Sequence, residues 1–204
     1  MRSTRGEAEA ARNPVRRRRA GPGRQAGQAA VEFGISSVLL LFILLGLIDF
    51  SRVFYFDTGL HGAAREGARH GAWFDEPTRH NPYLYDSEIK TAVDQTLAGI
   101  SGVAPSVLAG NCPETADGNP YHNPPFVSSA YPAVGVYNQP NLFICYDNDP
   151  DLDLATAPTD NSRKLQDLNV ILLMNYGLAT GFMQSQIGRS IQVAAYAHII
   201  IQGR

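Results

Sequence analysis

The stretch that decides the fold lies near the N-terminus, where residues 33–48 read FGISSVLLLFILLGLI. These 16 residues carry no charge, and Glu32 and Asp49 bracket them. A helix of this length rises about 24 Å, slightly less than the roughly 30 Å of a bilayer core. Taken to Phe54 the segment is long enough to span, with Arg52 reaching outward and Asp49 near the far headgroups. Because no polar stripe interrupts the run, a transmembrane helix is favoured over a buried core helix.

The charge of the chain is divided unevenly around this segment. The 204 residues carry a formal charge of −2, but the first 27 hold eight Arg and two Glu, a net charge of +6. The remaining 177 residues carry a net charge of −8. A basic segment beside an apolar helix predicts, by the positive-inside rule, an N-terminus in the cytoplasm and an acidic bulk outside. A membrane topology signal is therefore favoured over a nucleic-acid-binding arm, and we expect no nucleic-acid partner.

The residues between the basic segment and the apolar helix are similar to a prepilin processing site. A secretory signal would need small residues just after the apolar run, where the chain instead reads DFSRVFYFD. Cutting after Gly27 makes Gln28 the first mature residue and Glu32 the fifth, as in type IV prepilins. A carboxylate at the membrane edge is costly unless paired, and the new α-amino group of a neighbouring subunit could pair with it. Glu32 would then set the register between subunits; the alternative is a headgroup-level charge that only flanks the span.

A longer stretch, residues 27–72, resembles the TadE-like family of minor-pilin-like proteins from tight-adherence (Flp-type) pilus systems. The resemblance rests on the Gly-x4-Glu-Phe start, the Leu-rich span, the Asp-Phe-x-Arg exit and the AAREGAR of residues 63–69. It implies a pseudopilin that a dedicated prepilin peptidase cleaves and that is needed for pilus assembly. The implied partners are that peptidase, other pilins or pseudopilins, the assembly machinery and membrane lipid. The implied location is the cytoplasmic membrane, crossed once, with a route into an extracellular pilus.

The sequence carries no recognisable enzyme signature. It contains no Gly-x-Ser-x-Gly, no His-Glu-x-x-His and no phosphate loop, so neither an enzyme nor a cofactor is expected. The alternative to a pilin is a single-pass membrane protein that is never cut and whose outer domain binds a ligand or partner. The mature N-terminus would separate the two, because only a pilin precursor would begin at Gln28 after processing.

Small residues recur every four positions beyond the span. Gly59, Ala63, Gly67 and Gly71 form one such row, and residues four apart share a helix face. A row of this kind lets another helix or a sheet approach closely. Two uses stay open: a seat against the protein's own outer domain, or a face for another subunit. We expect one long helix from about residue 29 to residue 70.

The rest of the chain predicts an α+β outer domain. Residues 87–100 have an apolar stripe at helical spacing, with Ser87 as the N-cap. Residues 102–140 are rich in Pro, Gly, Asn and Ser, which predicts a long irregular excursion. Three later apolar stretches predict the strands of a small antiparallel sheet packed on a helix: 142–146, 168–178 and 191–201.

The expected organisation has three parts. A basic cytoplasmic leader covers residues 1–27, and a transmembrane and extended helix covers residues 28–72. An extracytoplasmic head domain covers residues 73–204. This is a pilin-like arrangement of one long N-terminal helix and a compact α+β head.

Two features of the head are candidates for crosslinking or metal binding. Cys112 and Cys145 are the two cysteines, and an outside location permits a disulfide, the alternative being two free buried thiols. In the chain-entropy model such a link contributes on the order of 3–4 kcal/mol. A calcium loop counted from residue 147 would need Gly and Glu where Leu152 and Pro158 stand, so an acidic solvated turn is the alternative. The weak calcium candidates are Asp147, Asp149, Asp151 and Asp153.

Overall fold

The computed structural model describes residues 23–74, 81–82, 85–119, 122–146, 166–178, 180, 184 and 188–202. The chain divides into two compact units, Met1–Phe42 and Ile43–Arg204. Residues 1–22 of the leader lie outside the described residues. The four calcium candidates, Asp147, Asp149, Asp151 and Asp153, also lie outside them.

Helix α1 (Gly23–Ala72) contains the predicted span. It begins before and ends after the predicted limits of residues 29 and 70. Its apolar segment is long and hydrophobic enough to cross a membrane, and none of that window is buried against the rest of the chain. Large apolar side chains such as Phe33 and Ile35 are therefore exposed, at 75% and 71%. A core helix would bury these side chains, so the exposure is what a lipid-facing segment requires.

The sheet of the head has the order β1-β2-β3-β4. Strands β2 (Asn141–Tyr146), β3 (Asp167–Gly177) and β4 (Ser190–Ile200) form an antiparallel meander, within one residue of the predicted strand limits. The short strand β1 (Val107–Leu108) pairs in parallel with β2 at the edge of the sheet. The sheet is therefore mixed, and its parallel pair was not predicted.

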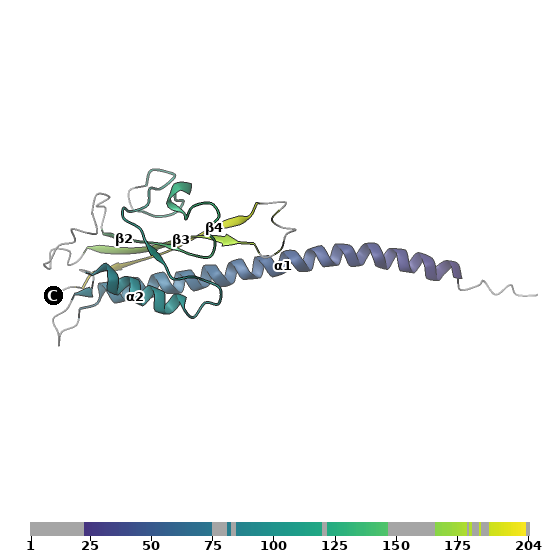
Figure 1. Cartoon of the computed structure of the whole chain (residues 1–204), viewed down its shortest axis with the longest axis horizontal. Helices are drawn as coiled ribbons and strands as arrows, with labels where there is room; N and C mark the ends of the chain where they lie inside the picture. Colours follow the sequence, from purple (N-terminus) through teal and green to yellow (C-terminus); the bar gives the residue numbers. More distant parts are fainter. Residues whose placement is uncertain are drawn as a thin grey trace, which may run out of the picture. The chain divides into compact units, whose positions relative to one another are not determined.

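Helix α2 (Asp86–Leu97) lies beside the end of α1 on one face of the sheet (Figure 1). Its stripe of Ile89, Val93 and Leu97 is buried, as the spacing predicts. The predicted N-cap was wrong. Tyr85 holds the extended N-cap conformation and helical geometry begins at Asp86, so Ser87 already lies inside the first turn and cannot cap it. The helix ends at Leu97, before the predicted residue 100.

The sheet separates two apolar clusters, because alternate residues of a strand point to opposite faces. We call the side covered by α1 and α2 the helical face; Val170 and Leu172 of β3 pack there with Phe56 and Leu60 of α1. The other side is the excursion face, where Ile171 and Leu173 of β3 pack against the long segment between β1 and β2. Among its described residues, this segment, residues 109–140, forms one short 3-10 turn, η2 (Ser128–Ala130), and a β-bridge between Thr115 and Phe126. It lies over the sheet opposite the helices (Figure 1).

Candidate functional site

The predicted processing segment lies near the start of α1. Gly27, Gln28 and Glu32 are all exposed, and nothing comes within 4 Å of the place a Cβ on Gly27 would occupy. The Gln28 side-chain amide donates a hydrogen bond to Glu32 Oε1, with a nitrogen–oxygen distance of 3.1 Å. The carboxylate therefore lies on the same helix face as residue 28 and remains open to a partner.

The small-residue row lies against the head's own core. A Cβ on Gly67 would lie 2.5 Å from Val93 Cγ2 of α2 and 3.3 Å from Val170 Cγ1 of β3. A Cβ on Gly71 would lie 2.6 Å from Leu168 Cδ2. These distances are too short for a real side chain, so the glycines let α2 and β3 approach α1. Gly59 contacts Ile100 in the same way, and Ala63 is fully buried.

These contacts favour the intramolecular use of the row over a face for another subunit. The exposed side of this part of α1 carries Gly62, Arg65 and Arg69 instead. Arg69 is paired with Glu66 one turn earlier, with a nitrogen–oxygen distance of 2.6 Å. Around Gly62 nothing comes within 4 Å of a built Cβ, so that glycine is not required by packing inside the chain.

A polar contact joins α1 to the head where the uncharged run ends. Asp49 is only 1% exposed, and both of its carboxylate oxygens lie 3.3 Å from the backbone N–H of Thr180. The Thr180 hydroxyl also donates to this carboxylate. Asp49 thus contacts Thr180 in the connection between β3 and β4. Its expected position near the far headgroups stays a prediction. No local pattern in the sequence marks this contact, because Thr180 lies 131 residues further along the chain.

A buried tyrosine lies close to the same contact. Tyr176 of β3 is fully buried, with its ring centroid 5.0 Å from that of Phe56 of α1. Its hydroxyl has no hydrogen-bond partner among the described residues. Burial raises the pKa of this phenol, while the nearby charge of Arg52 acts to lower it. Tyr176 therefore stays neutral at physiological pH and fills space beneath α1.

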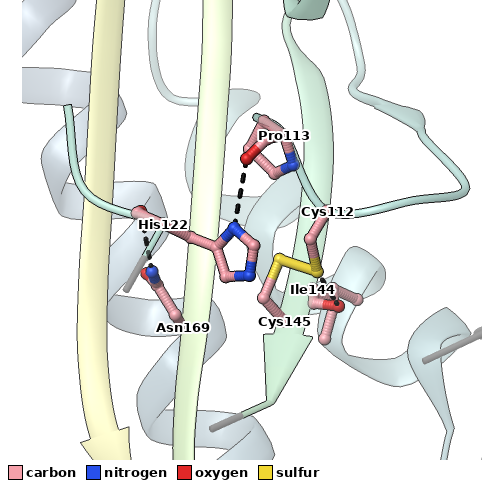
Figure 2. The surroundings of a disulfide bond; sticks show 6 residues. All are labelled: Cys112, Pro113, His122, Ile144, Cys145 and Asn169. Atoms are coloured by element: carbon pink, nitrogen blue, oxygen red, sulfur yellow. Dashed lines mark hydrogen bonds between the residues drawn. A yellow bond between two sulfur atoms is a disulfide. The ribbon is translucent and has the colours of Figure 1, made fainter. Parts of the chain in front are cut away.

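The excursion is fastened to the sheet by the disulfide between Cys112 and Cys145 (Figure 2). Cys145 lies in β2 directly opposite Asn169 of β3. The Asn169 amide donates to the carbonyl of His122 at 3.2 Å, and the His122 ring Nδ1 lies 3.1 Å from the carbonyl oxygen of Pro113. Figure 2 shows the imidazole beside the two sulfur atoms. The disulfide expected from the sequence is therefore present, and it crosslinks the irregular segment to the sheet.

Further amide side chains hold the excursion at other points. The Asn175 amide donates to the carbonyl of Pro132 at 2.7 Å, and the Asn141 amide donates to the carbonyl of Ala130 at 3.1 Å. These are buried or half-buried polar groups whose hydrogen bonds offset their removal from water. The apolar pattern that predicts β3 gives no sign of this role for its Asn residues.

Among the described residues, no group of three or more His, Cys, Asp or Glu side chains is placed to hold a metal ion. The described parts of the chain thus carry a membrane-capable helix, an exposed carboxylate beside residue 28, and a crosslinked head.

The family comparison agrees with this description. Residues 27–69 match the family model described as TadE-like protein, as the resemblance in the sequence predicted. The proteins of this family are structural and pilus-associated, and the matched segment is similar to them. The matched segment begins at Gly27 and ends inside α1, so the head lies beyond it. No curated protein and no solved structure matches the chain.

Proposed function

We propose that this protein is a minor pilin or pseudopilin-like structural component of tight-adherence pilus assembly. The observation that carries the proposal is the TadE-like match, which starts at the glycine of the expected cleavage site. The exposed apolar surface of α1 supports it, because such a surface needs lipid or other helices around it. The head then lies outside the cytoplasm, as the charge asymmetry predicts.

Processing is the first step of the proposed function. A prepilin peptidase cleaves the chain after Gly27 and removes a leader with a net charge of +6. The bond to Gln28 lies within α1, so the first turns of the helix have to unwind for the peptidase to reach it. Glycine lowers helix stability by roughly 1 kcal/mol relative to alanine, which favours opening at this point.

Assembly is the second step. After cleavage the α-amino group of Gln28 becomes a cation at the membrane edge, and Glu32 of a neighbouring subunit pairs with it. The exposed Glu32 carboxylate is available for this role, because its one contact with residue 28 is a side-chain hydrogen bond at the surface. Pairing two charges at this depth offsets the cost of holding either one alone in the membrane.

The test is to determine the N-terminus of the protein isolated from cells with an active prepilin peptidase. Intact mass and N-terminal sequencing should give a mature chain that begins at Gln28. A chain that keeps its leader in such cells would overturn the pilin proposal and favour the alternative, an uncut single-pass membrane protein with an outer binding domain.

The Glu32→Ala variant separates processing from assembly. We expect it to be cut normally but to be lost from the assembled pilus or its assembly complex, since the charge pair is gone. The matched control is Ser36→Ala, one turn further along the same face, which should be cut and assembled like the unchanged protein. Normal assembly of Glu32→Ala would contradict the register role.

A further inference from the structure

A buried imidazole on the excursion face has one ring nitrogen without a partner. His122 is only 8% exposed, and its Nδ1 lies 3.1 Å from the carbonyl oxygen of Pro113. A carbonyl oxygen can only accept a hydrogen bond, so Nδ1 carries the proton and Nε2 is left with a free lone pair. Among the described residues, Nε2 has no hydrogen-bond partner. A buried polar atom that stays unpaired is uncommon and points to a role other than packing.

The unpaired nitrogen lies on the side of the ring that faces the Cys145 sulfur atom (Figure 2). Two hydrogen bonds hold the residue there. Pro113, whose carbonyl accepts from Nδ1, directly follows Cys112 in the chain. Asn169, which donates to the backbone carbonyl of His122, stands opposite Cys145 in the sheet. Neither bond involves a sulfur atom, so the imidazole keeps its place beside Cys145 when the disulfide is open.

The two cysteines differ in their access to a reagent. Cys112 is half-buried, whereas Cys145 is 1% exposed and belongs to the apolar cluster of the excursion face with Phe143 and Ile171. Apolar surroundings disfavour the thiolate, which is the form of cysteine that attacks a disulfide. An external oxidant therefore meets Cys112 first, and Cys145 needs a base close by to become a nucleophile.

We propose that His122 is the base that ionises Cys145 in the last step of forming the Cys112–Cys145 bond. The head is then a site of thiol–disulfide exchange whose substrate is an external disulfide. The inference goes beyond the pilus proposal and does not depend on it, because it needs only the residues of the head. It also explains the unpaired Nε2, since in the open chain the Cys145 thiol can donate to that nitrogen.

The exchange takes two balanced steps. In the first, Cys112 loses its proton to water and its thiolate attacks the external disulfide. A mixed disulfide forms, and the first leaving thiolate takes up a proton from water. In the second, the Cys145 thiol gives its proton to His122 Nε2 and its sulfur attacks that of Cys112. The second leaving thiolate departs with the proton of the imidazolium, so two protein thiols are oxidised and one external disulfide is reduced to two thiols.

Other ionisable groups lie near the imidazole. Glu114 lines the same cavity as His122, a space of about 310 Å³. On β4, His198 is bonded to Asp167 and, at 2.8 Å, to the side-chain oxygen of Asn123, the residue after His122. His198 is therefore already engaged through both ring nitrogens. Glu114 is the alternative base, and it enters the test as a variant.

The test follows reoxidation of the full chain in detergent. The protein is reduced, freed of reductant and mixed with oxidised glutathione at pH 7, and free thiols are trapped with iodoacetamide at successive times. Intact mass separates the reduced chain, the mixed disulfide and the closed form, so each step has its own rate. Cys145→Ser should take up glutathione at the rate of the first step, and Cys112→Ser at least about tenfold more slowly, because its remaining thiol is buried.

His122→Asn removes the base while asparagine tolerates the left-handed backbone of this residue, whose φ is 48°. Closure of the mixed disulfide should slow by roughly one hundredfold at pH 7, the lower end of what a general base supplies. The first step should keep its rate. The matched controls are His70→Asn, at a histidine of α1, and Glu114→Gln, and both should close like the unchanged protein.

The pH profile of closure separates a base from a structural role. Between pH 7 and pH 8 the rate of His122→Asn should rise about tenfold, because its thiol has to ionise unaided, while the rate of the unchanged protein should change little. Closure of His122→Asn at the unchanged rate would overturn the proposal. Equal slowing of both steps would also overturn it, since loss of structure alone has that effect. Slow closure in Glu114→Gln would assign the base to Glu114 instead.

Discussion

One face of the sheet is covered by two regular helices, and the other by a segment with almost no regular structure. On the helical face, contacts are apolar and repeat along α1 from Phe56 to Ala68, and glycines bring this part of the helix close to Val93 and Val170. On the excursion face, few apolar side chains take part, and a disulfide and scattered amide hydrogen bonds hold the segment. The helical face should therefore unfold cooperatively, whereas the contacts that hold the excursion should be lost one at a time.

The largest effect should follow from breaking the excursion face at its covalent anchor. Replacing both Cys112 and Cys145 by serine removes a crosslink worth on the order of 3–4 kcal/mol in the chain-entropy model. Hydrogen exchange of the full chain in detergent should accelerate mainly in residues 109–140, while α2 keeps its protection. Adding reductant to this double variant should change nothing further, and equal loosening of α2 would show that the two faces are one cooperative unit.

The helical face is tested by a pair of glycines on the same helix. Gly67→Ala adds a methyl group where Val93 and Val170 leave no room, and overpacking of this kind costs about 1–3 kcal/mol. Gly62→Ala adds the same group on the open side, and its better helix propensity should stabilise by up to about 1 kcal/mol. The midpoint of thermal unfolding, followed by circular dichroism in detergent, should fall for Gly67→Ala and rise for Gly62→Ala. A shift of both midpoints in the same direction would contradict the close approach at Gly67.

A single hydrogen-bond anchor of the excursion should matter less. Asn175→Ala leaves the Pro132 carbonyl without its partner, at a cost of about 1–2 kcal/mol. The control is Gln192→Ala, at the exposed residue that pairs with Asn175 across the sheet, which should stay within about 0.5 kcal/mol. If both variants unfold at the same temperature, the amide is not an anchor.

The smallest effect is a dependence on pH at the start of α2. Burial raises the pKa of Asp86 to about 6. In the unfolded chain this carboxyl titrates near 3.8, so its favourable contribution is complete below that pH and is lost as the pH rises through about 6. Asp86→Asn should flatten the stability profile between pH 4 and pH 7 as measured by thermal unfolding, and an unchanged slope would assign the dependence to other groups.

Most of the elements on the helical face could be predicted from the sequence, but few of the contacts on the excursion face could be. The stripe of Ile89, Val93 and Leu97 and the three β-strands repeat at fixed periods, so local spacing was enough to find them. The disulfide followed from the presence of two cysteines in a chain expected to lie outside the cytoplasm.

The remaining contacts depend on residues far apart in the sequence. Asn175 bonds to Pro132, and Asp49 bonds to Thr180, with no periodicity to mark either pair. The parallel pairing of β1 with β2 also joins residues far apart in the sequence, and the two exposed residues of β1 carry no strand pattern. The Ser87 cap was wrong because Tyr85 takes the extended conformation one residue before the helix starts.

The packing of α1 against the head also decides where the chain can be truncated for laboratory expression. A fragment that begins at Trp73 would lose Phe56, Leu60 and Ala68, and would leave Val93 and Val170 open to water. Such a fragment would aggregate, because those side chains have no other cover. A soluble fragment has to retain the helix from about Phe56 onward and omit the apolar turns before it. The N-terminal boundary of a fragment suited to expression therefore lies inside α1.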